Sequence, residues 1–449
     1  MFIRPAAKYV NTVMPDLIRH PLSSWIPAFA GMTYVGGFHR RSNNRRILQS
    51  VQVFGMCIFL IAALPTFGAA LTWPEIEARA KDQTVDWFMW GGFPSTNAYV
   101  NGYVAPRVKE LYNITLRQVP VKDIAEVVSK LLVEKQAGKT AGGEVDLMWI
   151  NGENFRTCKR HSLLYGPFAD LLPNQKLVDW SKPSVKNDFG EPVEGLESPW
   201  GSAQVVMIYD SRRTPNPPKS VGALLDWARK NPGRFTYPAP PDFTGSVFVR
   251  HVFYHAAGDV SVWQGQFEEK RFEAAASTTY KILRDLAPHL WRQGKTYPEN
   301  PLRLSQLLAD GEVDFAISYH PAEASKMIHD GLYPATVRTF VFEEGTIANT
   351  HFVAIPFNAA EKEGAMVVAN FLISPEAQLK KADPSVWGDF PAIDISRLEP
   401  AWQAKFAALP RGVATLPNDV LQQHQLPEPP SEILIRLEKG WDEHVLKGR

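Results

Sequence analysis

The sequence predicts an α/β protein with two lobes, and two observations support this prediction. Short apolar runs of strand length alternate with segments of helical periodicity from about residue 73 onward, a pattern typical of strands joined by helices. The chain that follows an export-type leader has 449 − 70 = 379 residues, more than one hydrophobic core usually serves. Thirteen Trp and 25 Phe residues supply ample apolar area.

The first predicted unit is strand–helix–strand–helix–strand. Its strands are residues 85–90, 114–121 and 145–150, and its helices are residues 97–112 and 123–135. Right-handed crossovers at this spacing build a largely parallel sheet, in which ligands lie beyond the carboxyl ends of the strands. Two of these ends are Trp90-Gly91-Gly92 and Asn151.

A second alternating unit follows a Pro-rich passage. Its predicted strands are residues 204–209, 235–238, 313–318 and 350–356, and its predicted helices are residues 221–230, 247–257, 302–309 and 360–372. The alternation up to residue 318 predicts a second α/β lobe.

The N-terminal region has the parts of a secretory signal. Arg45 and Arg46 precede an uncharged stretch, residues 47–71, which ends in small residues. Cleavage after Ala70 places Gly68 and Ala70 at the two positions that must be small, so we expect residues 44–70 to be removed on export. The alternative is a retained membrane anchor, since about 20 apolar residues span a bilayer.

The segment before this signal, residues 1–43, lacks a clear helical or strand period. We interpret it as a spurious upstream extension and exclude it from the reasoning about the fold.

Charge and cysteine content exclude two classes of protein. Residues 1–70 contain seven basic residues and one acid, so the remainder has 48 − 7 = 41 basic and 47 − 1 = 46 acidic side chains, a net charge of −5. A mildly acidic chain without Lys/Arg blocks has no electrostatic footprint for nucleic acid. Cys57 leaves with the signal, and Cys158 alone forms no internal disulfide.

Several segments resemble class II periplasmic solute-binding proteins of ABC importers. The strand at 350–356, the helix after it and the ending Phe371-Leu372-Ile373-Ser374-Pro375-Glu376 are similar to that family's return into the first lobe. Ser198-Pro199-Trp200-Gly201 resembles the first hinge crossing. The string Trp149-Ile150-Asn151-Gly152-Glu153-Asn154-Phe155 looks specifically like the YnjB-type branch, whose substrate is not established.

The resemblance implies two α/β lobes that are joined by a hinge with crossing strands and close around a ligand. It implies residues 71–200 and 350–388 in lobe 1, and residues 203–345 and 389–449 in lobe 2. It also implies a periplasmic monomer without a cofactor, whose partners are a membrane permease and an ATPase. A Gly-rich phosphate loop ending in Lys-Ser/Thr does not occur in the sequence, so the ATPase should be a separate polypeptide.

The candidate ligand-binding residues lie at predicted strand ends, at helix starts and at the hinge. They are Trp90, Gly91, Gly92, Asn151, Trp200, Thr244, Gly245, Ser246 and Tyr319. The aromatic faces can stack on a ring of the ligand or bind its amine. The glycines beside Trp90 and Trp200 would allow the ligand to approach closely. Core packing of each Trp is the alternative.

The segment Thr244-Gly245-Ser246 would offer free amides and hydroxyls at a helix start. Simple N-capping is the alternative there.

No metal site is predicted. His251 and His255 lie one helical turn apart, but they lack a third ligand nearby and are interpreted as an exposed pair on an amphipathic helix. The Tyr-Tyr pair of iron-binding relatives is absent from the sequence. An exported hydrolase or lyase is the rival function, although neither Gly-x-Ser-x-Gly nor His-Glu-x-x-His occurs. The acidic charge and the aromatic ends favour a small polar or cationic organic ligand, captured without catalysis.

Overall fold

The computed structural model describes residues 71–265 and 267–448. The predicted signal and the upstream extension lie outside these residues. One sheet has the order β11-β10-β3-β1-β2, with β6 paired to the other edge of β10. Strands β1 (Thr84–Trp90), β2 (Thr115–Val121) and β3 (Leu147–Ile150) are mutually parallel, which confirms the predicted parallel sheet.

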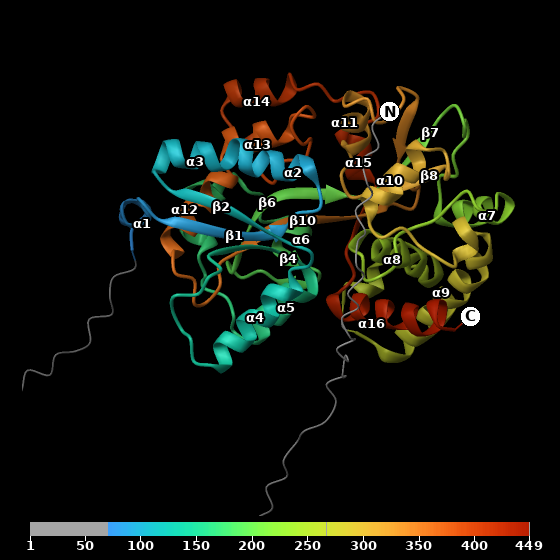
Figure 1. Cartoon of the computed structure of the whole chain (residues 1–449), viewed down its shortest axis with the longest axis horizontal. Coiled ribbons are helices and arrows are strands. Elements are labelled where there is room, and N and C mark those ends of the chain that lie inside the picture. Colours follow the sequence, from blue (N-terminus) through green and yellow to red (C-terminus); the bar gives the residue numbers. More distant parts are fainter. Residues whose placement is uncertain (1–70, 266, 449) are drawn as a thin grey trace, which may run out of the picture. The chain divides into compact units, whose positions relative to one another are not determined.

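Two long strands run from the first sheet towards the second (Figure 1). Strand β6 (Glu197–Gln204) pairs antiparallel with β10 (Thr346–Ala354) along its whole length. At one end β10 also pairs with β3, and at its other end it pairs with β11 (Gln425–Pro427). These are the crossing strands that the family resemblance implies.

The second sheet is small and antiparallel, in contrast to the parallel arrangement of the first. Strand β7 (Val206–Asp210) lies between β8 (Phe315–Ser318) and β9 (Val337–Phe340) and is antiparallel to both. Strand β7 follows β6 after a single residue, so the chain passes directly from the crossing strand into this sheet. A separate pair joins β4 (Asn187–Asp188) to β5 (Glu191–Pro192).

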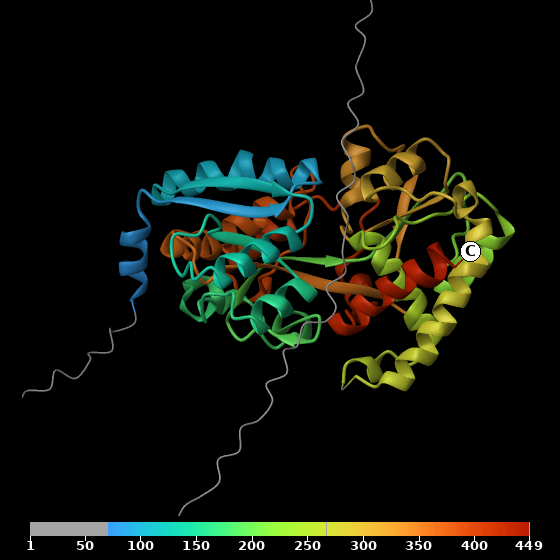
Figure 2. The same ribbon diagram turned by 60° about the horizontal axis from the view of Figure 1, so that its bottom comes forward.

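Each helix packs in the hydrophobic core of one of the two sheets. Figure 2 shows the two groups of helices from a second direction. Around the first sheet pack α1 (Trp73–Ala80), α2 (Pro94–Tyr99), α3 (Ala105–Tyr112), α4 (Ala125–Gln136), α5 (Gly152–Arg160), α6 (Pro183–Lys186), α12 (Lys362–Leu372), α13 (Pro375–Ala382) and α14 (Pro400–Ala407). Around the second pack α7 (Val221–Lys230), α8 (Phe243–Ala257), α9 (Glu269–Leu286), α10 (Pro301–Ala309), α11 (Glu323–His329), α15 (Asn418–Gln423) and α16 (Ser431–Trp441).

Two predicted elements differ from the structure. No strand forms at residues 235–238; the carbonyl of Phe235 accepts the amide of Trp291 at 2.8 Å instead of joining a ladder. The predicted helix at 97–112 is continuous in path but contains a π-helical turn, Val100–Val104, between α2 and α3.

The segment after residue 388 also differs from the expectation, which assigned it to lobe 2. Ile393, Leu398 and Phe406 pack in the core of the first sheet, together with Trp200 and helix α12. Only from about Ala414 onward do the buried residues of the C-terminal region join the core of the second sheet. The chain therefore passes between the two cores a third time.

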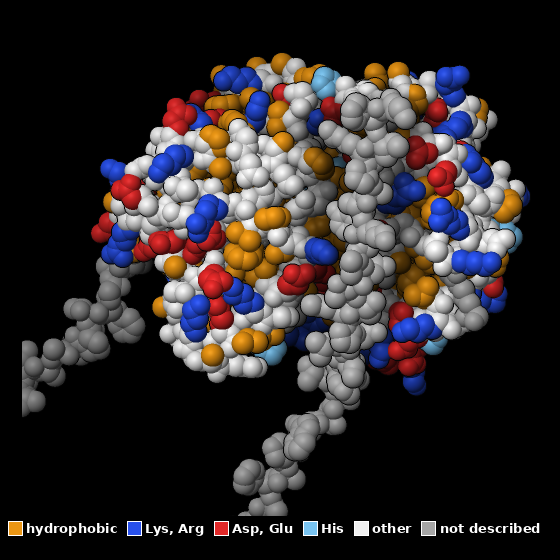
Figure 3. All heavy atoms as spheres, in the orientation of Figure 1, with side chains coloured by type: hydrophobic (Ala, Val, Ile, Leu, Met, Phe, Trp, Pro, Cys, Tyr) orange, Lys and Arg blue, Asp and Glu red, His pale blue; other side chains and the backbone are white. Residues whose placement is uncertain are grey.

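Among the described residues, every helix is too short or too polar to cross a bilayer. On the face in Figure 3, where grey atoms do not cover it, acidic and basic side chains are interspersed and form no block of one sign.

Candidate ligand-binding site

The loops that follow β1 and β8 meet, as the geometry of strand ends predicts. Trp90, the last residue of β1, packs edge-on against Phe93, with ring centroids 5.0 Å apart. Phe93 in turn lies edge-on to His320, at 5.5 Å. His320 directly follows Tyr319, one of the predicted residues. The first and second sheets thus contact each other through aromatic rings at two strand ends.

Asn151 has a structural role at the start of α5. It occupies the N-cap position, and its side-chain amide donates to the carbonyl of Thr350 on β10 at 2.6 Å. The indole N–H of Trp149 donates to the Asn151 side-chain oxygen at 3.1 Å. Asn151 therefore ties the end of β3 to the crossing strand.

Trp200 is a core residue in this structure. Its side chain is fully buried, within β6 rather than beyond a strand end. Trp87, Trp149 and Trp387 surround it, with ring centroids 4.9–5.3 Å away. An indole in this position supports the hinge from within the core.

The two glycines that follow Trp90 serve internal packing. A Cβ at Gly92 would lie 2.2 Å from the ring of Trp90, and a Cβ at Gly91 would lie 2.6 Å from Pro120. The expectation that these glycines leave room for a ligand is therefore corrected. They leave room for a neighbouring side chain.

The start of α8 is already capped, which corrects the expectation of free amides. Asp242 is the N-cap, and one of its carboxylate oxygens accepts the amides of Thr244 and Gly245, both at 2.9 Å. The amide of Ser246 donates to the Asp242 carbonyl at 2.7 Å. These three amides are all engaged, so an anion would find no free donor among them.

Tyr319 belongs to a polar group that sequence reasoning missed. We name it the Arg250 cluster; its members are Arg250, Tyr319, Asn349 and Glu428, with Phe189 and Phe243 as its aromatic walls. Arg250 donates to the Tyr319 hydroxyl at 2.8 Å, and that hydroxyl donates to Glu428 at 2.8 Å. Asn349 of β10 donates to the same Glu428 oxygen at 3.0 Å.

The Arg250 cluster has unused hydrogen-bonding capacity. Glu428 Oε2 lies 3.4 Å from Arg250 Nη1, yet both atoms, and Arg250 Nε, are buried without a hydrogen-bond partner. A buried charged group with an unmade hydrogen bond costs free energy. A molecule that forms hydrogen bonds with these atoms would therefore form a more stable complex.

Aromatic faces enclose this charged centre, and one of them is accessible. The guanidinium carbon of Arg250 lies 5.2 Å from the ring centroid of Phe243 and 5.5 Å from that of Phe189. Phe243 also stacks on Tyr319 at 5.0 Å, and 42% of its surface is exposed. Phe189 comes from the loop between β4 and β5, while Asn349 of β10 and Tyr319 after β8 bring segments of both larger sheets to the cluster.

Acidic groups predominate around Arg250. Burial raises the pKa of Glu428, Glu153 and Asp188 above their usual ranges. It also raises the pKa of Asp242 to about 6 and that of Glu438 to about 7. Five carboxyl groups thus share this region with one guanidinium, and their burial favours the protonated, neutral form of each carboxyl.

Sequence reasoning missed Arg250 and Glu428 because they lie 178 positions apart and in unremarkable contexts. Arg250 lies in the middle of a predicted helix, and Glu428 follows β11 within a Pro-rich stretch. Only the path of the C-terminal segment back to β10 brings them together.

A separate cavity lies against the crossing strands. Its volume is about 260 Å³, and it is lined by residues of β6, β10, α15 and the segment 390–395. Asn349 is its only member from the Arg250 cluster, and none of the nine predicted residues lines it.

The histidine pair on α8 differs from the expectation of two exposed side chains. His255 is exposed, whereas His251 is buried and engaged through both ring nitrogens, with Val247 O and with the amide of Ile347. Among the described residues, three other side chains have metal-ligand geometry: His320, His351 and Asp389.

Comparison with known proteins shows the family. Residues 104–410 match the model of the bacterial extracellular solute-binding proteins. Protein YnjB of Escherichia coli strain K12 is 42% identical over 345 residues, which cover 76% of this chain and 88% of that protein.

Two solved structures of similar fold are distant in sequence. A putative spermidine/putrescine ABC transporter from Listeria monocytogenes superposes with a TM-score of 0.56 at 14% identity, over 80% of this chain and 98% of that chain. A periplasmic thiamin binding protein superposes with a TM-score of 0.55 at 16% identity, over 81% and 96%. They confirm the class II periplasmic-binding-protein fold. The chain belongs to the bacterial extracellular solute-binding proteins, non-enzymatic proteins of YnjB type that capture a small molecule outside the cytoplasm for the membrane permease of an ABC transporter.

Proposed function

We propose that this protein captures a small organic cation between its two lobes, with the Arg250 cluster as the centre of the site. The observation that carries the proposal is the unsatisfied carboxylate oxygen of Glu428 beside the accessible ring of Phe243. An ammonium group can donate to that oxygen while the cation packs on the aromatic face. Of the residues predicted from sequence, Trp90, Asn151 and Tyr319 would border the ligand, and Trp200 would support the floor.

The surrounding carboxylates supply the preference for positive charge. An incoming cation would favour the ionised form of these carboxyl groups, because a nearby opposite charge offsets the cost of their burial. The same argument disfavours phosphate-bearing ligands. The start of α8, with its amides capped by Asp242, gives an anion no compensating donors.

Capture would proceed by hinge bending about β6 and β10. We assign residues 71–200 and 350–407 to lobe 1 and residues 203–345 and about 414–448 to lobe 2. The assignment of 389–407 to lobe 1 follows the packing of Ile393, Leu398 and Phe406. We further propose export by the signal at 44–70, a monomeric protein, and a separate ATPase on the cytoplasmic side of the permease.

A ligand panel of defined charge tests the proposal. Spermidine, putrescine and thiamine serve as cations, γ-aminobutyrate as a zwitterion and fructose 6-phosphate as an anion. Distant structural neighbours carry these compounds in their names. We expect at least one cation to raise the midpoint of thermal unfolding and fructose 6-phosphate to leave it unchanged. Stabilisation by the phosphate ester alone would refute the proposal.

Two variants locate the site by isothermal titration calorimetry with the cation that binds. Phe243→Ala removes an exposed aromatic face and should weaken binding by about 0.5–2 kcal/mol. Gln422→Ala, an exposed position of α15 that lines the separate cavity, should leave the affinity unchanged. The reverse pattern would place the ligand in that cavity instead.

A further inference from the structure

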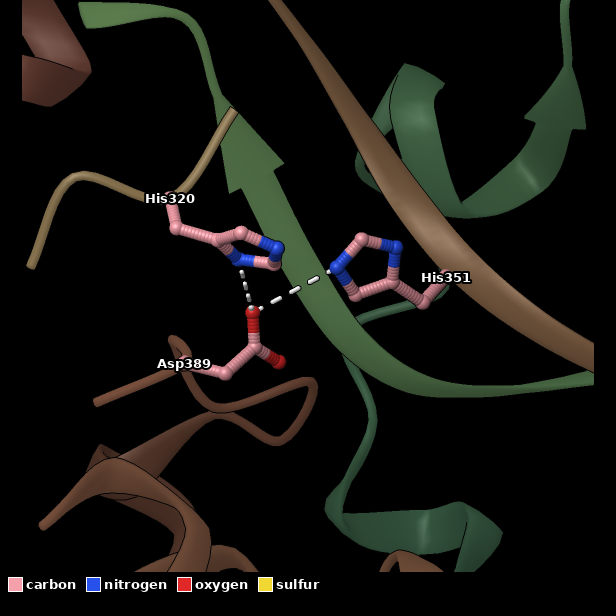
Figure 4. A group of neighbouring side chains, drawn as sticks. All are labelled: His320, His351 and Asp389. Atoms are coloured by element: carbon pink, nitrogen blue, oxygen red, sulfur yellow. Dashed lines mark ion pairs between the residues drawn. The ribbon is translucent and has the colours of Figure 1, made fainter. Parts of the chain in front are cut away.

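A second group of side chains lies beside the crossing strands and shares no residue with the Arg250 cluster. His351 belongs to β10, His320 to the loop after β8, and Asp389 to the loop after α13. Figure 4 shows both imidazole rings directed at one oxygen of the Asp389 carboxylate. We name these three residues the His–His–Asp cluster.

The contacts within the cluster are too long for good hydrogen bonds. Asp389 Oδ1 lies 3.5 Å from His320 Nδ1 and 3.3 Å from His351 Nε2, whereas a charge-assisted N–H···O⁻ bond is about 2.7–2.9 Å long. All three atoms are buried and lack a hydrogen-bond partner. Three unsatisfied polar atoms that face one point indicate a missing common partner.

The separations match those between ligands of one metal ion. Zinc bonds to imidazole nitrogen and carboxylate oxygen are about 2.0–2.2 Å long, and a tetrahedron with such bonds has edges of roughly 3.3–3.6 Å. The two measured separations fall in that range, and the three ligand atoms lie within 4.8 Å of one another. A single ion could therefore be bound with small adjustments of the side chains.

Neighbouring groups hold the carboxylate in the orientation that a metal site needs. Lys381 donates to Asp389 Oδ2 at 2.6 Å, and also to the carbonyls of Trp200 and Phe390. This leaves only Oδ1 for a further partner. A Cβ at position 201 would lie 2.2 Å from that same Oδ2, so Gly201 gives the ion pair its space. Outer contacts of this kind orient the ligands of metal sites.

We propose that the His–His–Asp cluster binds one divalent transition-metal ion of the Zn²⁺ class, with a fourth position open to a small ligand. Two imidazoles and one carboxylate suit Zn²⁺ and its neighbours, whereas Mg²⁺ and Ca²⁺ require mostly oxygen ligands. Lys381 already neutralises Asp389, so a divalent ion adds uncompensated positive charge. The fourth ligand should therefore be an anion such as hydroxide or chloride.

The bound ion would join segments from both sheets. His320 follows β8 of the second sheet, while Asp389 follows α13, which packs in the core of the first sheet. The side chain of His320 is 11% exposed and that of Asp389 is fully buried, so an ion can reach the site past His320. Metal binding should therefore hold the two lobes in the arrangement seen here.

Equilibrium dialysis of the metal-stripped protein against ZnCl₂ tests this proposal. We expect one equivalent of Zn²⁺ to bind and MgCl₂ to fail to compete at a hundredfold excess. His320→Gln and His351→Gln should each weaken Zn²⁺ binding at least tenfold. His255→Gln, the matched removal of an exposed histidine, should leave it unchanged. Equal weakening by all three variants, or by none, would overturn the proposal.

X-ray absorption of the zinc-loaded parent protein gives a reading that does not depend on how the variants fold. A site with two imidazole ligands and one carboxylate is expected. A spectrum without imidazole scattering would overturn the proposal. Neither result bears on the organic cation, because ligand binding at the Arg250 cluster is measured separately, in the presence of a chelator.

Discussion

His251 illustrates how one buried side chain can be held in a single protonation state. Its Nδ1 lies 2.7 Å from the carbonyl of Val247, and its Nε2 accepts the amide of Ile347 at 3.1 Å. Only the neutral ring with its proton on Nδ1 satisfies both contacts. Burial lowers the pKa of His251 to about 4, in agreement with this geometry.

This arrangement predicts a specific loss of stability in mild acid. As the pH falls below about 6.5, His251 becomes protonated in the unfolded chain but stays neutral in the folded protein until the pH nears 4. The free energy of unfolding should therefore fall across that pH range. At pH 5 the loss is about 2 kcal/mol. Thermal unfolding of the parent and of His251→Gln at pH 7.5 and pH 5 measures it.

The variant cannot titrate at this position, so its deficit relative to the parent should shrink at pH 5. A deficit that stays constant between the two pH values would show that His251 does not carry the effect.

Glycine allows two backbone segments to pack closely where a side chain would clash. The start of α8, which packs against the backbone of Pro238, is the clearest case. A Cβ at Gly245 would lie 1.9 Å from the carbonyl oxygen of Pro238. Because that atom belongs to the backbone, Gly245→Ala must displace the helix start. We expect destabilisation of about 1–3 kcal/mol, visible as a lower midpoint of thermal unfolding.

Gly102→Ala is the matched control. This position is helical and exposed, and nothing lies within 4 Å of a Cβ built there. The substitution should be neutral or stabilise by up to about 1 kcal/mol. Equal losses for the two variants would mean that the close contact with Pro238 is not responsible.

Elements with strong local signals were predictable from sequence. Helix α7 has the predicted bounds, because a Ser N-cap and a regular apolar period mark it. The strand predicted at residues 204–209 corresponds to β7, whereas the crossing strand β6, which begins at Glu197, was not predicted as a strand because Pro199 and Gly201 indicate a loop. Proline is tolerated there because β6 is an edge strand, and its edge position depends on the whole sheet.

At the scale of the whole molecule, the sequence predicted the strand ends beside Tyr319 and Asn151, but it did not reveal which distant residues contact them. Arg250 meets Glu428 only because β11 returns to pair with β10. Likewise, His320, His351 and Asp389 come from three separate segments. No local sequence pattern predicts contacts between residues so far apart in the chain. The Arg250 cluster and the His–His–Asp cluster can therefore be identified only from the complete structure.

The central claim is that the two lobes capture a small organic cation at the Arg250 cluster. Native mass spectrometry of the protein purified without unfolding, with release and identification of any bound compound, tests it most directly. The account predicts one small organic cation per chain, with a lower bound fraction in Phe243→Ala and an unchanged one in Gln422→Ala. An anionic compound, or a cation that Phe243→Ala retains fully and Gln422→Ala loses, would contradict it.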